Sequence, residues 1–168
     1  TYKNAISNLA LGGGKAVIIG DSKTMKSEAL FRRFGKFVDS LAGNYITAED
    51  VGMETRDMDV IREVTPFVTG ISEHNGGSGN PSPVTAHGVY MGMKAAVNYK
   101  FGTDNLEGKK ILVQGVGHVG ETLVKYITDE GAHVIINDIN ESRLKELSKK
   151  YNANVVLGND IYNLDLDV

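Results

Sequence analysis

Three consecutive glycines stand directly before Lys15 in the segment LGGGKAVI, residues 11–18. Such a stretch can cradle a phosphate, make an ordinary turn into a strand, or hold a reactive amine in place. A phosphate-binding P-loop has the pattern GxxxxGK followed by Ser or Thr. Counting back from Gly14, the first glycine of that pattern falls on Leu9, and Ala16 takes the place of the hydroxyl residue. The P-loop is therefore excluded, and the other two interpretations remain open.

Two further charged residues could act together with Lys15. They are Lys3 near the start of the chain and Asp50 in TAEDVG, where a strand breaks into a glycine loop. A lysine that is partly desolvated and near another ammonium has a lowered pKa, because both effects disfavour its charged form. Such an amine can act as a general base near neutral pH. Spacing alone leaves a surface lysine and a turn aspartate equally possible.

A second glycine motif, VQGVGHVG, has the GxGxxG spacing of a dinucleotide-binding loop. It follows an apolar strand pattern and precedes a helix pattern, and the next strand pattern ends in Asp138. In this context the pyrophosphate lies on the helix N-terminus and the acid accepts hydrogen bonds from the adenosine ribose. The residues expected to bind the cofactor here are Gly115, Gly117, His118, Val119, Gly120 and Asp138.

The carboxylate of Asp138 favours NAD over NADP, because a 2′-phosphate would meet a negative charge there. The alternative is a glycine-rich turn in a flavodoxin-like domain that binds no dinucleotide. His118 is as well explained by a solvent-facing position beside the cofactor as by any chemical role.

Composition excludes several other classes of function. The chain has 168 residues, no cysteine and a formal net charge of −3. Thiol nucleophiles, disulfides and thiolate metal sites are excluded, and we expect no bound metal. The charge gives no reason to expect nucleic acid or a membrane as partner. The absence of cysteine fits the reducing cytoplasm, which is the expected location.

The first half of the chain reads as helices joined by glycine-rich turns. The expected elements are an amphipathic helix in residues 1–11, a buried strand at 15–20, helices at 22–43 and 55–64, a strand from residue 44 into the loop near residue 50, a turn-rich stretch at 74–83 and a helix at 84–102. Asp21 and Ser27 are candidate N-terminal caps of the second helix, and Gly43 is a candidate C-terminal stop.

From Lys109 onward strand and helix patterns alternate. The expected strands are 109–114, 133–138 and 154–157, with helices at 118–131 and 142–151 between them. This alternation predicts a parallel sheet with right-handed crossovers, as in an α/β protein. Both ends of the chain look cut, so we expect a piece of a longer protein, truncated at both ends.

Five blocks of the sequence together resemble one enzyme family. The blocks are TYKNAISNLALGGGKAVI, YITAEDVG, FVTGIS, GNPSPVTAHGVYMGMKAA and GTDNLEGKKILVQGVGHVGE. They span nearly the whole chain and closely resemble the Glu/Leu/Phe/Val dehydrogenase family, above all its leucine dehydrogenases. The resemblance implies the reversible, NAD-dependent oxidative deamination of an L-amino acid to a 2-oxo acid and ammonia.

The resemblance also implies a role for individual residues. Lys3 would pair with the substrate carboxylate, and Lys15 would be the catalytic lysine that activates water. Asp50 would carry protons to and from the substrate nitrogen. Ala48 would line the side-chain pocket and leave room for a branched aliphatic group, and Thr85 would hydrogen-bond the nicotinamide amide.

The implied fold is α/β, with a partial substrate domain followed by a partial Rossmann NAD-binding domain. Residues 1–80 would belong to the substrate domain, 81–104 would form a hinge and linking helix, and 105–168 would be the first half of the Rossmann domain. The family also implies a homo-oligomer in the full-length protein. Because segments flanking the substrate and the nicotinamide are absent, we expect the isolated piece to have little or no activity.

Several alternatives stay open. A related amino-acid dehydrogenase could act on valine, phenylalanine or glutamate, and a non-catalytic paralogue could merely bind NAD. Malic enzymes and methylenetetrahydrofolate dehydrogenases share a related two-domain plan, but the combination of Lys3, GGGK and AEDVG argues against them. The family commonly has Asn where this chain has His118.

Overall fold

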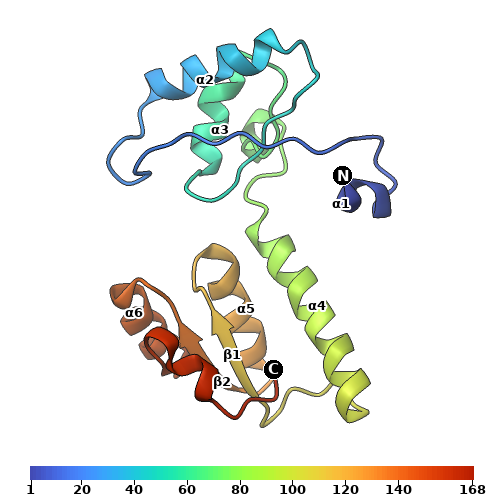
Figure 1. Cartoon of the computed structure of the whole chain (residues 1–168), viewed down its shortest axis with the longest axis vertical. Coiled ribbons are helices and arrows are strands. Elements are labelled where there is room, and N and C mark those ends of the chain that lie inside the picture. Colours follow the sequence, from blue (N-terminus) through green and yellow to red (C-terminus); the bar gives the residue numbers. More distant parts are fainter. The chain divides into compact units, whose positions relative to one another are not determined.

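The computed structural model describes all 168 residues and divides the chain into two compact units (Figure 1). The N-terminal unit is Thr1–Pro81 and the C-terminal unit is Ser82–Val168. None of the helices combines the length and the apolar character that crossing a membrane requires.

The N-terminal unit is built around two packed helices, α2 (Glu28–Ser40) and α3 (Thr55–Arg62). Before them lies the short helix α1 (Tyr2–Ile6), and after them a 3-10 helix, η1 (Glu73–Asn75). The core consists of the buried apolar side chains of Phe31, Met58, Val60, Ile61, Val68 and Ile71. This small core holds the two helices against the segment that follows α3.

Helix α2 is shorter than the predicted helix at 22–43. It begins at the Ser27 cap, whose hydroxyl accepts a hydrogen bond from the Leu30 amide at 3.2 Å. Asp21 instead caps an earlier turn by accepting the Lys23 amide at 2.8 Å. Phe31 and Val38 on α2 are buried, whereas Phe37 is 57% exposed.

The predicted buried strand at 15–20 is wrong. These residues have no regular secondary structure, and Val17 and Ile19 are 78% and 95% exposed. A strand exists only beside a hydrogen-bonded neighbour, and no backbone–backbone hydrogen bond joins residues 12–20 to any other segment. An apolar pattern predicts a strand, but it does not reveal whether a neighbouring strand is present to pair with it.

The predicted strand near residue 47 is reduced to a single bridge. Thr47 pairs in parallel with Val68, through hydrogen bonds from the Thr47 amide to the Phe67 carbonyl at 3.0 Å and from the Thr69 amide to the Thr47 carbonyl at 2.9 Å. This bridge anchors the segment immediately before Ala48 and Asp50.

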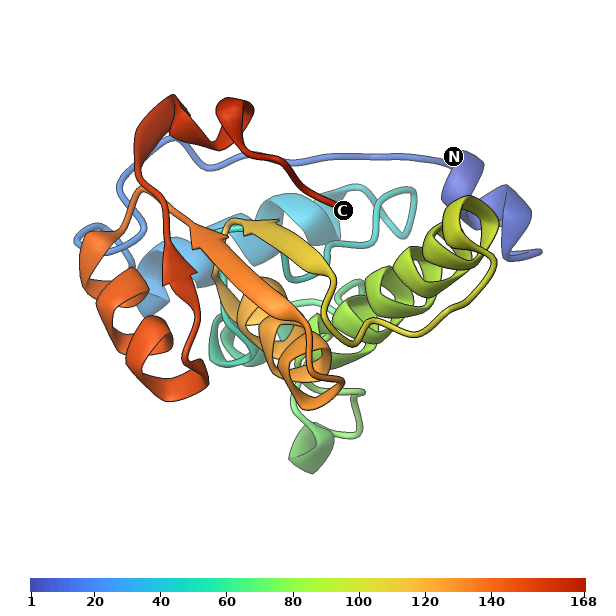
Figure 2. The ribbon, with the colours of Figure 1, turned by 90° about the horizontal axis from the view of Figure 1, so that it is seen from below.

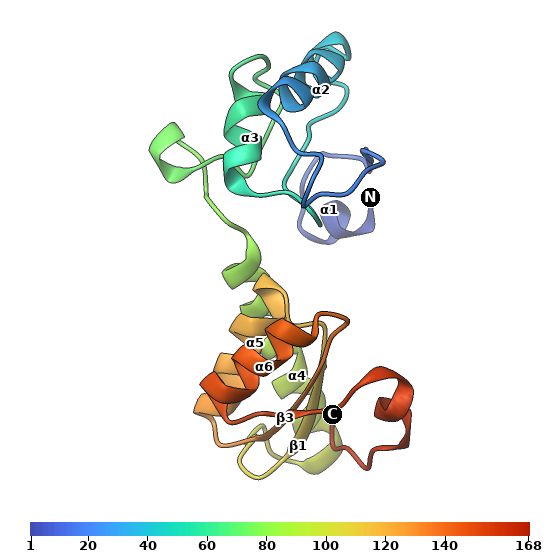
Figure 3. The same cartoon turned by 90° about the vertical axis from the view of Figure 1, so that its left-hand side faces the viewer.

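The C-terminal unit confirms the predicted alternation of strands and helices. In chain order it contains α4 (Ser82–Phe101), β1 (Lys110–Gln114), α5 (His118–Asp129), β2 (His133–Asn137), α6 (Glu141–Tyr151), β3 (Asn154–Val155) and the 3-10 helix η2 (Gly158–Asn163). The three strands are parallel, in the order β1-β2-β3. Helices α5 and α6 lie side by side, each connecting two neighbouring strands (Figure 3).

One apolar core joins the sheet to its helices. It includes Ile111 and Ile136 from the strands, Val124 and Leu144 from α5 and α6, and Val97 from α4. Helix α4, expected to be part of a separate hinge and linking segment, packs against α5 within this unit. The assignment of substrate and cofactor domains along the chain stays a prediction.

The free edge of β1 is covered by the last residues of the chain (Figure 2). The Leu112 amide donates to the Val168 carbonyl at 3.0 Å, and the Asp167 amide donates to the Lys110 carbonyl at 2.9 Å. The end of the chain therefore extends the hydrogen bonding of the sheet beyond its three named strands.

Gly35 provides a test of the packing of α2 on α3. A Cβ atom at this position would lie 2.3 Å from Val64 Cγ2 and 3.3 Å from the Ile61 carbonyl oxygen. We expect Gly35→Ala to lower the free energy of unfolding by about 1 kcal/mol or more, since overpacking outweighs the gain in helix propensity. Gly92→Ala on α4 is the matched control, because a Cβ there meets nothing within 4 Å. Thermal unfolding followed by circular dichroism should show a lower midpoint for Gly35→Ala alone; equal midpoints for the two variants would contradict this packing.

Candidate functional site

The structure brings two of the predicted site residues into direct contact. The Lys15 ammonium forms an ion pair with Asp50 Oδ2, although the two residues are far apart in sequence. Residues 12–20 form no backbone–backbone hydrogen bond, although the Gly12 carbonyl accepts the Asn4 side-chain amide at 2.6 Å. The ion pair with Asp50 is therefore the contact that holds the Lys15 side chain. A proton donor and a proton acceptor in contact can exchange a proton, which is the chemistry expected of both residues.

The backbone around Asp50 orients its carboxylate. Asp50 Oδ1 accepts the Val51 amide at 2.6 Å, and the Asp50 carbonyl accepts the Met53 amide at 2.9 Å. Gly52 completes this turn with a φ of +79°, a conformation that glycine adopts without strain. One carboxylate oxygen is thus held by the turn while the other faces Lys15.

A glycine is also required beside Lys15 itself. A Cβ atom on Gly14 would lie 2.9 Å from Cδ2 of the Tyr45 ring. The absence of a side chain lets the GGGK segment lie against Tyr45, five positions before Asp50. The glycine run therefore brings the two segments close enough for the ion pair to form.

The lysine and the aspartate are both accessible to solvent. Their side chains are 64% and 57% exposed, respectively. A lysine acts as a base near neutral pH when it is desolvated and lies near another ammonium. The N-terminal unit provides a carboxylate partner and an open surface instead.

The three other residues predicted to bind substrate or nicotinamide are all exposed. Lys3 is exposed on α1, and no hydrogen bond or ion pair joins it to Lys15 or Asp50. Ala48 is exposed and directly follows the buried Thr47. Thr85 is an exposed residue in the first turn of α4. The expected roles of these three residues stay predictions.

In the C-terminal unit, the glycine motif forms a tight connection between β1 and α5. Gly115 has a φ of +90°, and its amide donates to the Asn137 carbonyl at 2.8 Å. A Cβ on Gly120 would lie 2.0 Å from the Gly115 carbonyl oxygen, so only glycine lets α5 start so close to the strand. Gly117 is the N-cap of α5, and a Cβ added there would meet nothing within 4 Å.

Asp138 lies directly beside this connection. Its Oδ2 accepts the Val116 amide at 2.7 Å, and its Oδ1 accepts the Asn140 amide at 2.8 Å. Each oxygen retains capacity for a further hydrogen bond, because a carboxylate oxygen has two lone pairs. The acid at the end of β2 is therefore in contact with the glycine loop after β1, and the cofactor-binding role of these residues stays a prediction.

His118 and Val119 form the start of α5. His118 is exposed, and its backbone carbonyl accepts the Thr122 hydroxyl at 3.0 Å. Val119 is partly buried. The position of His118 at the helix N-terminus fits either of the two interpretations left open for it.

An ion-pair network beside the loop has no counterpart in the sequence analysis. Arg143 on α6 pairs with Glu121 on α5, and its Nε donates to the Val116 carbonyl at 3.3 Å. Lys150 donates to the other oxygen of Glu121 at 2.9 Å. The hydrogen bond from Lys150 holds the pKa of Glu121 below its ordinary value, against the opposing effect of partial burial. The spacing of charges within α6 gives no sign of this network, because its partners lie on another helix.

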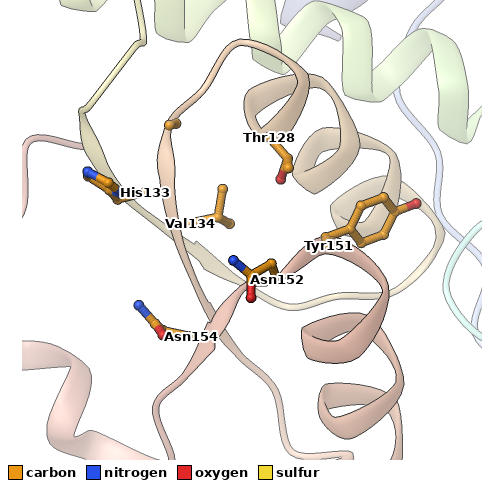
Figure 4. A pocket seen from close by; sticks show the side chains of 7 residues that line it. Thr128, His133, Val134, Tyr151, Asn152 and Asn154 are labelled. Atoms are coloured by element: carbon orange, nitrogen blue, oxygen red, sulfur yellow. The ribbon is translucent and has the colours of Figure 1, made fainter.

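A cavity of about 270 Å³ lies elsewhere in the C-terminal unit (Figure 4). It is lined by Thr128, Ala132, His133, Val134, Tyr151, Asn152 and Asn154. His133 begins β2, whereas Asp138 follows the end of that strand. Each residue lengthens a strand by about 3.3 Å, so the cavity and the glycine loop lie at opposite ends of β2. The cavity is therefore not part of the loop site.

Both parts of the chain match sequence models of known enzyme domains. Residues 1–67 match "Glu/Leu/Phe/Val dehydrogenase, dimerisation domain". Residues 76–142 match "Glutamate/Leucine/Phenylalanine/Valine dehydrogenase". The two matches together include every predicted site residue.

Individual relatives give the same result. The chain is 55% identical over 168 residues to leucine dehydrogenase of Bacillus cereus, covering 100% of this chain and 46% of that protein. It thus spans about half the length of the curated relatives that it matches. The crystal structure of L-tryptophan dehydrogenase from Nostoc punctiforme aligns with a TM-score of 0.64 at 36% identity, over 98% of this chain and 45% of that one. Hetero-hexameric glutamate dehydrogenase from Thermus thermophilus shares the fold, with a TM-score of 0.69 at 19% identity over 98% and 46% of the two chains.

The glycine loop gives a paired test of its geometry. We expect Gly120→Ala to lower the free energy of unfolding by about 1–3 kcal/mol, because the new methyl group would collide with the Gly115 backbone. Gly117→Ala has open space around the added Cβ and should unfold within about 0.5 kcal/mol of the parent chain. Urea unfolding of both variants measures the difference. If Gly120→Ala were as stable as Gly117→Ala, the close contact between α5 and β1 would be disproved.

Proposed function

This chain belongs to the Glu/Leu/Phe/Val dehydrogenase family, and we propose that the whole protein catalyses the reversible, NAD-dependent oxidative deamination of a branched-chain L-amino acid. L-Leucine is the proposed substrate, and the products are the 2-oxo acid and ammonia. The observation that carries the proposal is the contact between Lys15 and Asp50. It joins the two residues whose acid–base chemistry the reaction needs.

Oxidation of the amine at the substrate Cα requires removal of a hydride, and NAD, when bound, supplies the acceptor. The remaining steps are proton transfers. Once its proton has passed to Asp50, Lys15 removes a proton from the water that attacks the oxidised carbon. Asp50 exchanges protons with the substrate nitrogen as ammonia leaves. Their contact lets a proton pass directly from one group to the other, so both can be reset during a catalytic cycle.

Substrate recognition is assigned to the flanking residues. Lys3 provides a positive charge for the substrate carboxylate, and charge-assisted hydrogen bonds of this kind are strong. Ala48 follows the anchored Thr47 and contributes only a methyl group, which leaves room for a branched aliphatic side chain. The 55% identity to a leucine dehydrogenase supports leucine over larger or charged substrates.

The cofactor proposal is supported by the shape of the loop after β1. The space around Gly117, in which a Cβ would meet nothing within 4 Å, fits an approaching pyrophosphate. The N-terminus of α5 offers unpaired amide groups and a favourable dipole to that anion. Asp138 has free lone pairs for the ribose hydroxyls and repels a 2′-phosphate, which favours NAD over NADP. We assign Thr85 to the nicotinamide amide.

Self-association is part of the proposal for the whole protein. The sequence model that matches residues 1–67 is described as a dimerisation domain. We therefore propose a homo-oligomer, with small-molecule substrates and neither nucleic acid nor membrane as partner.

Turnover by the whole protein tests the function and the residue roles together. We expect NAD reduction with L-leucine, L-valine and L-isoleucine, and much less with L-phenylalanine, L-glutamate or with NADP. Lys15→Ala should lower kcat with leucine at least about a hundredfold, the range for loss of a general acid–base group. Lys36→Ala is the control, because Lys36 is an exposed lysine on α2 that has no ion pair with Asp50.

Three outcomes would each overturn a part of this proposal. Near-normal turnover by Lys15→Ala would remove the assigned mechanism. A preference for phenylalanine or glutamate would leave the proposed reaction class unchanged but show that the proposed substrate is wrong. NAD binding without turnover of any amino acid would indicate a non-catalytic paralogue.

A further inference from the structure

We propose that Arg143 is a positioning residue for the dinucleotide loop: it holds the Val116 carbonyl so that the Gly117 amide faces the pyrophosphate. The inference rests on the proposed function in one respect, the identity of the ligand as a dinucleotide. The contacts of Arg143 with Val116, Glu121 and Glu146 do not depend on which ligand is bound.

Val116, the middle residue of the sequence GVG, is held from both sides. Its side chain is fully buried, at 0% exposure. Its amide donates to Asp138 Oδ2 at 2.7 Å, and its carbonyl accepts Arg143 Nε at 3.3 Å. An acid from the end of β2 and a cation from α6 therefore fix the two peptide groups that flank this residue.

The planarity of the peptide bond transmits this constraint to Gly117. The Val116 carbonyl and the Gly117 amide belong to one trans peptide unit, in which C=O and N–H point in opposite directions. When Arg143 holds the carbonyl on the α6 side, the Gly117 amide must point away from α6. No backbone carbonyl of the chain accepts that amide, and the space beside Gly117 is open.

The guanidinium of Arg143 is itself held in a fixed orientation. Its NH2 group pairs with Glu121, and its NH1 group donates to Glu146 Oε2 at 3.1 Å. Lys150 holds the other oxygen of Glu121 at 2.9 Å. Arg143 and Glu121 are only 27% and 22% exposed. Because guanidinium is planar, anchoring its two terminal nitrogens also directs Nε toward Val116.

This arrangement distinguishes positioning from simple electrostatic attraction. The charges of Arg143 and Lys150 are matched by those of Glu121 and Glu146. The network therefore adds little net positive potential at the loop. A lysine at position 143 would keep the charge but could not bond two carboxylates and the Val116 carbonyl in one plane.

The experiment compares Arg143→Met and Arg143→Lys with a matched control, Arg32→Met. Arg32 also bonds two carboxylates, Glu28 and Glu63, but it lies in the N-terminal unit. Dissociation constants for NAD are measured on the 168-residue chain, and KM for NAD and kcat on the whole protein. The amide resonance of Gly117 is followed by NMR without any ligand.

We expect both Arg143 variants to raise the dissociation constant and KM for NAD about tenfold or more, as for loss of a charge-assisted hydrogen bond. At saturating NAD, kcat should stay within about twofold, and the Gly117 resonance should shift or broaden. Arg32→Met should leave NAD binding and the Gly117 resonance unchanged.

Restoration of NAD affinity by Arg143→Lys would overturn the proposal, because charge alone would then suffice. An unchanged Gly117 resonance in Arg143→Met would overturn it as well. If the whole protein bound neither NAD nor NADP, the proposed cofactor would be wrong, while the Gly117 resonance would still decide whether Arg143 orients the loop.

Discussion

The contact between the start of α5 and the end of β1 is the constraint on which the C-terminal unit depends. With no side chain on Gly120, the helix can begin where a Cβ would lie only 2.0 Å from the Gly115 carbonyl oxygen. This short connection buries Val116 and brings its amide within reach of Asp138. A larger residue at position 120 would push α5 outward and separate the glycine loop from the acid. One missing methyl group thus determines whether two distant parts of the sequence form one site.

The N-terminal unit positions its charged residues in a different way. Lys15 lies in a segment without regular secondary structure, and its side chain is located by the contact with Asp50. Asp50 in turn is oriented by a turn that lies three residues after Thr47, and Thr47 is bonded to the segment after α3. The acid therefore has a fixed support, whereas the lysine depends on its partner.

The difference between the two units explains what the sequence could predict. In the C-terminal unit each strand pairs with the next strand along the chain, and a single helix connects the two. A local pattern such as that of residues 109–138 therefore contains both strands of a pair. The segment 15–20 has the same apolar character, but a strand requires a neighbour that no local pattern reveals, and here none pairs with it. Lys15 and Asp50 could be singled out by their motifs, and their contact could be expected only through the family resemblance. The role of Arg143 could not be predicted from the sequence, because its partners, Glu121 and Val116, become neighbours only after α5 and α6 pack together.

The two sites also differ in how readily they can rearrange, and the difference suits their proposed tasks. Exposed ion pairs contribute about 0–1 kcal/mol to stability, so the pair of Lys15 and Asp50 can open at little cost when a substrate arrives. The peptide groups around Val116 are buried and held by an acid and a guanidinium, and breaking such contacts without replacement costs about 1–3 kcal/mol for each group. Proton transfer needs groups that change partners during every cycle, while binding of a pyrophosphate needs amides that already point in the right direction. An exposed loop fits the first requirement, and a strand–helix connection held by Asp138 and Arg143 fits the second.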